Sequence, residues 1–125
     1  MDIKKTFFRK KDYVFIRNGK EGTRYTPGEL AKIAQDKGAG EIIIQSINKD
    51  GTMAGYDLDL IKSISDSVAI PTVALGGCRN MEDCRSVYKN GRVNGIAAGS
   101  FFVYQGLNKG VLINYPSRED IIKIV

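Results

Sequence analysis

Two kinds of apolar pattern follow one another along the chain. Near its start, residues 4–8 and 13–17 are aromatic and β-branched runs separated by charged residues, and Asn18-Gly19 gives a turn signal after the second run. These runs predict a β-hairpin. From residue 26 onward, stretches with apolar residues three and four positions apart alternate with short, continuous apolar runs. This second pattern predicts alternating helices and buried strands.

The clearest helix signal is Thr26-Pro27-Gly28-Glu29, which combines a Thr N-cap, a Pro at the first helical position and a Glu that completes a capping box. Gly38 is expected to end this helix as a left-handed cap. The spacing predicts a buried face made of Leu30, Ile33 and Ala34. Three more helices are predicted, one capped by Asp57, one over residues 81–89 and one that opens on a capping box at residues 117–120.

Three continuous apolar runs, at residues 41–44, 70–75 and 95–98, lie between these helices. Strands that are apolar on both sides are typical of a parallel sheet covered by helices. They recur roughly every 25 residues, which is usual for a (β/α) barrel. A doubly wound open sheet is the alternative, but no Gly-x-Gly-x-x-Gly motif or P-loop follows any strand. The sequence therefore favours an α/β fold of the TIM-barrel type.

The length of the chain limits how much of a barrel it can form. A closed eight-stranded barrel needs about 250 residues, whereas this chain has 125. We therefore expect one half-barrel unit over residues 1–125, with a strand end and the β-hairpin in residues 1–25 and repeated β/α units in residues 26–125. Met1-Asp2-Ile3 is interpreted as the carboxyl end of a strand whose beginning is missing.

Composition narrows the function classes. The chain is 42% hydrophobic and 26% charged, which is globular composition, and neither a membrane span nor a signal peptide is apparent. We therefore expect a cytoplasmic protein with no membrane association. Because the chain has no His, catalysis by Ser-His-Asp or Cys-His groups is excluded, as is a tetrahedral zinc site. No metal or cofactor is predicted. Cys78 and Cys84 are interpreted as reduced thiols, and Cys78, with no His to activate it, is not expected to be a catalytic nucleophile.

The net charge of +5 suits an anionic ligand, a nucleic acid or an ordinary basic surface. The densest basic stretch is residues 4–11, in which Phe7 and Phe8 lie between Lys and Arg residues. Such a stretch resembles a nucleic-acid patch, but a solvated hairpin explains it equally well. No nucleic-acid partner is expected.

Candidate site residues follow the predicted strands, because ligands of barrel enzymes lie at the carboxyl ends of the strands. They are Asp2, Gln45, Ser46, Asn48, Asp50, Gly51, Gly76, Gly77, Gly99 and Ser100. Glycines beside polar groups let backbone N–H groups approach an anion closely, so their joint placement favours a bound phosphate. Three simpler interpretations stay open: that each glycine only turns the chain, that Asp2 is merely solvated, and that Asp50 forms an Asx-turn.

These residues belong to a recognisable order of motifs. The motifs are Gly38–Thr52, Gly55-Tyr56-Asp57, Gly76-Gly77 and Ala97–Ser100. Together they resemble the carboxyl half of the cyclase subunit of imidazole glycerol phosphate synthase, HisF, over nearly the whole chain. The resemblance implies a (β/α)8 barrel and a lyase of histidine biosynthesis. It also implies that ammonia from a HisH-like glutaminase partner converts a bis-phosphorylated aminoimidazole carboxamide ribonucleotide into imidazole glycerol phosphate.

The resemblance also assigns roles to residues. Asp2 matches the family's catalytic aspartate at the end of the fifth strand. One of the family's two phosphate sites is matched by Asp50, Gly51, Gly77, Gly99 and Ser100. The remaining strand-end residues, Gln45, Ser46, Asn48 and Gly76, are expected to contact substrate. No cofactor is implied.

Several positions depart from the usual family pattern. Asn48 replaces an aspartate, Leu75 replaces a serine, Gln45 replaces a threonine or asparagine, and Cys78-Arg79 replaces Ala-Gly. We expect these departures to bear on which reaction is catalysed.

Two runs, 74–77 and 112–117, look more like the branch of the family associated with surface-polysaccharide assembly, the glycosyl amidation-associated proteins. That branch implies ammonia delivered with a glutaminase toward a sugar.

The family's first catalytic aspartate and its second phosphate site lie in the amino half, which this chain does not contain. We therefore expect an incomplete site that needs a complementary amino half or a second copy of the chain. An alternative of another class is a non-catalytic half-barrel that binds phosphate and self-associates through its unpaired strand edges.

Overall fold

The computed structural model describes residues 1–6, 11–105 and 110–124. Its strands are β1 (Asp2–Lys5), β2 (Asp12–Ile16), β3 (Glu21–Gly22), β4 (Ile42–Ser46), β5 (Thr72–Leu75), β6 (Gly95–Ala97), β7 (Tyr104–Gln105) and β8 (Gly110–Val111). Its helices are α1 (Pro27–Asp36), α2 (Leu58–Ser65), α3 (Met81–Gly91), α4 (Ser100–Val103) and α5 (Arg118–Ile122). The predicted hairpin is present, whereas Phe7 and Phe8 lie outside the described residues.

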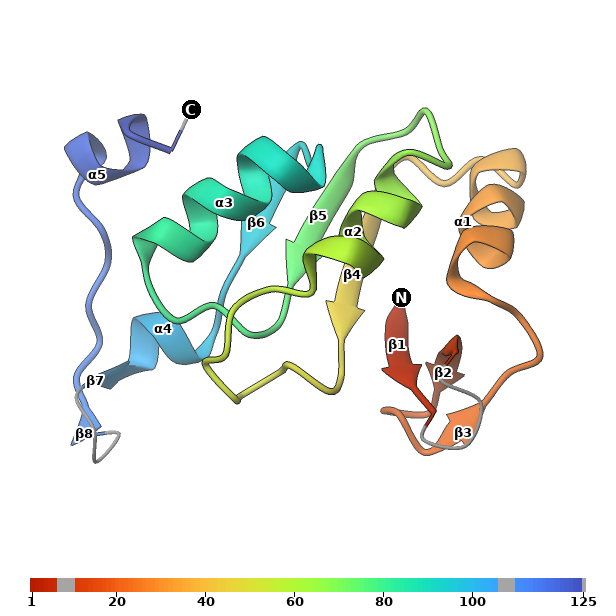
Figure 1. Cartoon of the computed structure of the whole chain (residues 1–125), viewed down its shortest axis with the longest axis horizontal. Coiled ribbons are helices and arrows are strands. Elements are labelled where there is room, and N and C mark those ends of the chain that lie inside the picture. The colour runs from red at the N-terminus through yellow and green to blue at the C-terminus, as the bar shows by residue number, and fades with distance from the viewer. Residues whose placement is uncertain (7–10, 106–109, 125) are drawn as a thin grey trace.

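Six strands form one sheet in the order β3-β2-β1-β4-β5-β6. Strands β1, β4, β5 and β6 are parallel neighbours; β2 pairs with β1 in the antiparallel direction, and β3 pairs with β2, also antiparallel. Helices α2 and α3 lie side by side against the parallel strands (Figure 1). The chain thus has mixed α/β structure with parallel strands and an amino-terminal hairpin, consistent with a partial TIM barrel, as the sequence predicts.

The two faces of the sheet have different environments. Side chains that point toward the helices are buried, among them Ile42 and Ile44 of β4. Ile43 lies between them and points to the other face, where 46% of the residue is exposed. Because alternate residues of a strand face opposite sides, β4 is apolar on both faces, although the described residues cover only one of them at this strand. The other face is referred to here as the uncovered face.

The helix boundaries follow the local signals. The Glu29 carboxylate accepts a hydrogen bond from the Thr26 backbone N–H at 2.9 Å, and Ser117 and Asp120 form the second predicted capping box. Gly38 follows the first helix with a φ of +91°, as a left-handed cap requires. None of the described helices has the length and apolar character needed to cross a membrane.

The buried face of α1 differs from the prediction. Pro27 and Ala31 are the buried residues of this helix, whereas 40% of Ile33 is exposed. The difference arises because α1 packs against β2 and α2 rather than squarely on the centre of the sheet. This contact turns Ala31 inward and leaves Leu30 and Ala34 on the wall of a hollow beside β4.

Candidate functional site

The carboxyl ends of the parallel strands meet at one edge of the sheet, and two hollows adjoin there. The first, called the cradle, is lined by Asp50, Gly51, Met53, Gly76, Gly77, Cys78, Ala98, Gly99 and Ser100. The second, called the carboxylate pocket, has a volume of about 230 Å³ and is lined by Asp2, Asn18, Gln45, Ile47 and Asp50. All five predicted phosphate-site residues line the cradle, and Asp2 lies in the pocket next to it.

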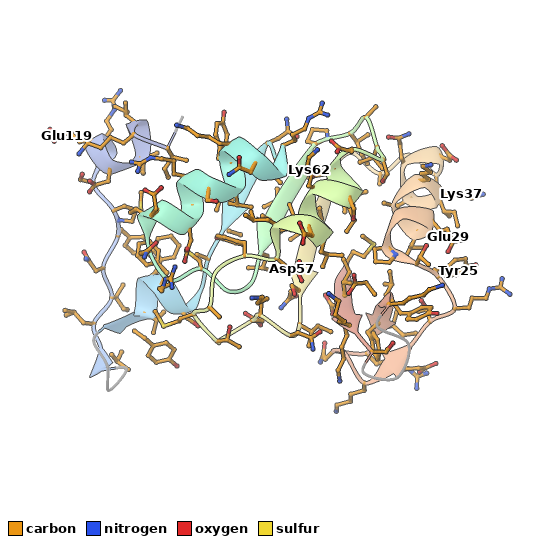
Figure 2. All side chains as sticks on the ribbon, in the orientation of Figure 1. Tyr25, Glu29, Lys37, Asp57, Lys62 and Glu119 are labelled. Atoms are coloured by element: carbon orange, nitrogen blue, oxygen red, sulfur yellow. The ribbon has the colours of Figure 1, made fainter. Side chains whose placement is uncertain are left out.

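The loop after β4 forms one wall of the cradle. The Ser46 carbonyl accepts hydrogen bonds from the backbone N–H groups of Lys49 and Asp50, at 3.1 and 2.9 Å, so the loop doubles back on the strand end. Gly51 completes the turn with a φ of +71°. Asp57 then caps α2 by accepting from the Leu60 N–H at 3.3 Å, and it stands at the start of that helix in Figure 2.

The Gly76-Gly77 pair joins this loop to the end of β5. Both residues have φ near +100°, a conformation that side chains rarely allow. A Cβ atom on Gly77 would lie 2.3 Å from the Gly55 carbonyl oxygen, and the Gly55 N–H donates to the Gly77 carbonyl at 2.8 Å. The glycines are therefore required for the close approach of two loops, and this approach builds the cradle.

Gly99 is under a different constraint. Its φ is −112°, and nothing lies within 4 Å of the place where a Cβ would stand. The backbone conformation therefore does not require glycine at this position, and the space in front of Gly99 is open. The strand that leads to it is held in place by the Tyr56 hydroxyl, which donates to the Ala97 carbonyl at 2.8 Å.

Asp2 and Gln45 occupy paired positions on β1 and β4, on the uncovered face of the sheet. The Gln45 side-chain amide donates to the Asp50 carboxylate at 3.0 Å, which holds that carboxylate in the pocket that also contains Asp2. No hydrogen bond from the loop backbone to the Asp50 side chain is present among the described residues, so an Asx-turn does not account for this residue.

Two predicted substrate contacts lie outside both hollows. Ser46 is only 2% exposed, because its place in β4 turns the side chain toward the helices. Asn48 accepts a hydrogen bond from the Lys5 N–H at 2.8 Å and so ties its loop to the end of β1. Gly76, by contrast, does line the cradle. The structure thus gives Ser46 and Asn48 positions that support the loop.

Two residues of the hollows carry no sequence signal for a site. Asn18 comes from the turn between β2 and β3, where Asn18-Gly19 predicts only a turn, yet it lines the same pocket as Asp2. Met53 lines the cradle with a φ of +54°, unusual for a residue with a side chain. Both residues reach the hollows only because the folded chain brings several segments together at the carboxyl ends of the strands.

The two hollows offer groups of the kinds that can bind an anion and transfer a proton. Four glycines line the cradle and no Lys or Arg is among its lining residues, so backbone N–H groups and the Ser100 hydroxyl are the donors it can offer an anion. The carboxylate pocket holds two acids, Asp2 and Asp50. In the part of the chain that the structure describes, no group of three or more His, Cys, Asp or Glu residues could hold a metal ion.

Comparisons with known proteins place these features in a family. The sequence pattern of the family described as histidine biosynthesis protein matches residues 1–108. The chain is 42% identical over 92 residues to the imidazole glycerol phosphate synthase subunit HisF of Nitrosopumilus maritimus, covering 74% of this chain and 35% of that protein. Identity to the HisF subunit of Chlorobium phaeobacteroides is 39% over 105 residues, 84% of this chain and 41% of that protein.

A Leptospira interrogans protein provisionally named as the same subunit is 45% identical over 120 residues, which are 96% of this chain and 47% of that protein. The chain thus spans about half the length of the curated relatives it matches. The family match covers both hollows at the strand ends. The chain therefore belongs to the histidine biosynthesis protein family, as a partial chain of the HisF cyclase type.

Proposed function

We propose that this chain supplies the carboxyl-terminal half of the active site of a HisF-like cyclase. Its substrate is a phosphorylated ribonucleotide, and ammonia comes from a HisH-like glutaminase partner in the cytoplasm. The observation that carries the proposal is the meeting of the glycine-lined cradle and the Asp2 pocket at one strand edge. A phosphate held in the cradle would place the rest of a substrate over Asp2 and Asp50.

Each hollow has a distinct part in the proposed reaction. Backbone N–H groups of Gly77, Gly99 and Ser100 bind one substrate phosphate, which anchors the molecule by a group that does not react. Asp2 acts as general acid and base on the ring-closing atoms, a role that requires a carboxyl group within hydrogen-bond reach of them. Gln45 positions the Asp50 carboxylate through the 3.0 Å hydrogen bond between the two side chains.

The uncovered face of the sheet supports the proposal that another half-barrel completes the site. On that face Asp2, Gln45 and Leu75 share one row across β1, β4 and β5. In a closed barrel this row would point to the barrel axis, where side chains of all strands pack in layers. The missing carboxylate and the second phosphate site would then come from the amino half of the barrel.

Sugar amidation in surface-polysaccharide assembly is a second candidate, because two of the departures from the family pattern, Gln45 and Leu75, are paired at or beside the carboxylate pocket. Gln45 lines the pocket and bonds Asp50, and Leu75 is its partner across β4 and β5. A larger amide and an apolar side chain at these places change what the pocket can bind. The cradle and Asp2 would keep the same roles with a different substrate.

Substitution of Gly99 by Asp tests the cradle. We expect inorganic phosphate to bind the chain and Gly99→Asp to abolish that binding, because the new carboxylate would stand in the open space before Gly99 and repel an anion. At about 4 Å, the repulsion between like charges costs about 1 to 4 kcal/mol in surroundings between water and a protein surface, which corresponds to a loss of affinity of at least about fivefold. Phosphate titration followed by NMR measures the effect.

The matched control is Gly28→Asp. Gly28 also has nothing within 4 Å of a Cβ, and it lies in the first turn of α1, far along the chain from the cradle. The control adds the same charge, so phosphate affinity should stay within about twofold of wild type. Equal phosphate affinity in Gly99→Asp and wild type would contradict the cradle assignment.

A non-catalytic half-barrel that self-associates is favoured by the same uncovered face. If two copies cover each other's faces, light scattering of the purified chain should give a discrete dimer. Ile43→Asp, which puts a charge on the exposed centre of that face, should convert the dimer to a monomer. Ile33→Asp is the control, since Ile33 is comparably exposed on α1. A monomeric wild-type chain would rule out self-association and leave the amino half-barrel as the complement.

A further inference from the structure

Two thiols lie in contact behind the cradle. Cys78 follows Gly77 on the loop after β5, and Cys84 lies in the first turn and a half of α3. Their sulfur atoms are 3.4 Å apart, and neither is bridged. Both residues are buried, with exposed fractions of 4% and 5%. Only a small further approach separates this contact from the roughly 2.05 Å of a disulfide bond.

The buried pair lies between two hollows. Cys78 lines the cradle on one side. Cys84 lines a separate, largely apolar cavity of about 300 Å³, bounded by α3, β6, α4 and the carboxyl-terminal segment. Ile96, Phe101 and Pro116 are among its walls. A small, uncharged molecule in that cavity would therefore meet the Cys84 sulfur without entering the phosphate site.

We propose that Cys78 and Cys84 are a reversible redox modification site, at which a hydroperoxide converts the two thiols into an intramolecular disulfide. The Cys84 sulfur attacks the terminal peroxide oxygen, the O–O bond breaks, and the alcohol or water leaves with a proton. The Cys84 sulfenic acid that remains is attacked by the Cys78 sulfur, and its oxygen departs as water. In sum, two thiols and one hydroperoxide give one disulfide, one alcohol or water, and one further water.

The surroundings assign different parts to the two sulfurs. The hydrogen bond from the Cys78 thiol lowers the pKa of Cys84, whereas that contact and burial raise the pKa of Cys78. Because the thiolate is the nucleophile, Cys84 is the sulfur that reacts with peroxide first. Cys78 is already in contact with it and acts as the resolving thiol.

Oxidation of the two thiols would change the shape of the cradle. Closing the sulfur contact pulls Cys78 toward α3, while the neighbouring Gly77 is held by its 2.8 Å hydrogen bond to Gly55. One wall of the cradle must shift, or this bond must stretch. An effect on phosphate binding rests on the proposed function, but formation of the disulfide does not.

The positions of the tryptic sites make the test direct. Trypsin cuts after Lys62, Arg79 and Arg85, so Cys78 and Cys84 fall in the separate peptides 63–79 and 80–85. The native chain is treated with hydrogen peroxide, its remaining thiols are alkylated, and the digest is analysed by mass spectrometry. We expect the two peptides to be joined in most molecules and separated again by a thiol reductant.

Single substitutions distinguish the roles of the two cysteines. In Cys78→Ser, sulfenic acid should accumulate on Cys84, where dimedone traps it; in Cys84→Ser, the dimedone adduct on Cys78 should be at least tenfold less abundant. Recovery of both cysteines as alkylated thiols in the native wild-type chain, or linkage mainly between different chains, would overturn the proposal. Disulfide formation is measured without phosphate or substrate. A failure of this proposal can therefore be distinguished from a failure of the proposed function.

Discussion

Replacement of Gly77 by alanine is expected to destabilise the folded chain by about 3 kcal/mol, because strained backbone and overpacking each cost about 1 to 3 kcal/mol. The residue has a φ of +101°, and the new Cβ would lie 2.3 Å from the Gly55 carbonyl oxygen. The atom that must move is this backbone oxygen, which cannot shift as easily as the end of a flexible side chain. A loss of this size is a large part of the stability of a small domain.

Urea unfolding followed by circular dichroism measures this effect, as a lower midpoint at an unchanged slope. Gly28→Ala is the matched control, because the glycine lies in helix α1 with open space around it. Alanine should be neutral there or should stabilise the chain by up to about 1 kcal/mol. A Gly77→Ala midpoint equal to that of wild type would show that the two loops are not in the close contact described.

Replacement of Asp2 by asparagine is expected to lower ammonia-dependent cyclase turnover by about 10²- to 10⁴-fold, the usual contribution of a general acid or base. The amide keeps the size of the side chain but cannot exchange a proton. The assay needs a complete barrel, so we would join this chain to the part of the Leptospira interrogans relative that it does not cover. Turnover and KM would be measured on the ribonucleotide substrate.

Asp59→Asn in the same chimera is the control, since Asp59 is an exposed acid in the first turn of α2. It should leave turnover unchanged. If Asp2→Asn turns over at the wild-type rate, Asp2 is a solvated residue and not the general acid and base. If the chimera folds and binds the ribonucleotide but makes no cyclised product, the amidation candidate gains support.

Much of the local structure could be predicted from the residues themselves. The capping boxes at Thr26 and Ser117, the glycine that ends α1, and the N-cap at Asp57 are formed by neighbours in sequence, so their signals are complete within a few residues. Strands β4 and β5 could be predicted for a similar reason, because a short, continuous apolar run between two predicted helices is typical of a buried strand.

Contacts between distant segments were less predictable. The periodicity of α1 favours a face containing Ile33, but packing on β2 and α2 turns Ala31 inward instead. Asn18 lines the carboxylate pocket because β2, which leads to it, pairs with β1 in the sheet. A periodic pattern records that a helix has an apolar side, but it does not record which neighbour that side meets.

For the candidate site, the sequence by itself determined which residues are available: acids and glycines that follow predicted strands, in an order typical of one family. The tertiary structure decided their grouping, because parallel strands bring their carboxyl ends to one edge and so join the cradle to the Asp2 pocket. It also decided that Ser46 faces the helices and that Cys78 meets Cys84. Such contacts depend on how the chain packs in three dimensions. The positions of the residues in the sequence therefore do not predict them.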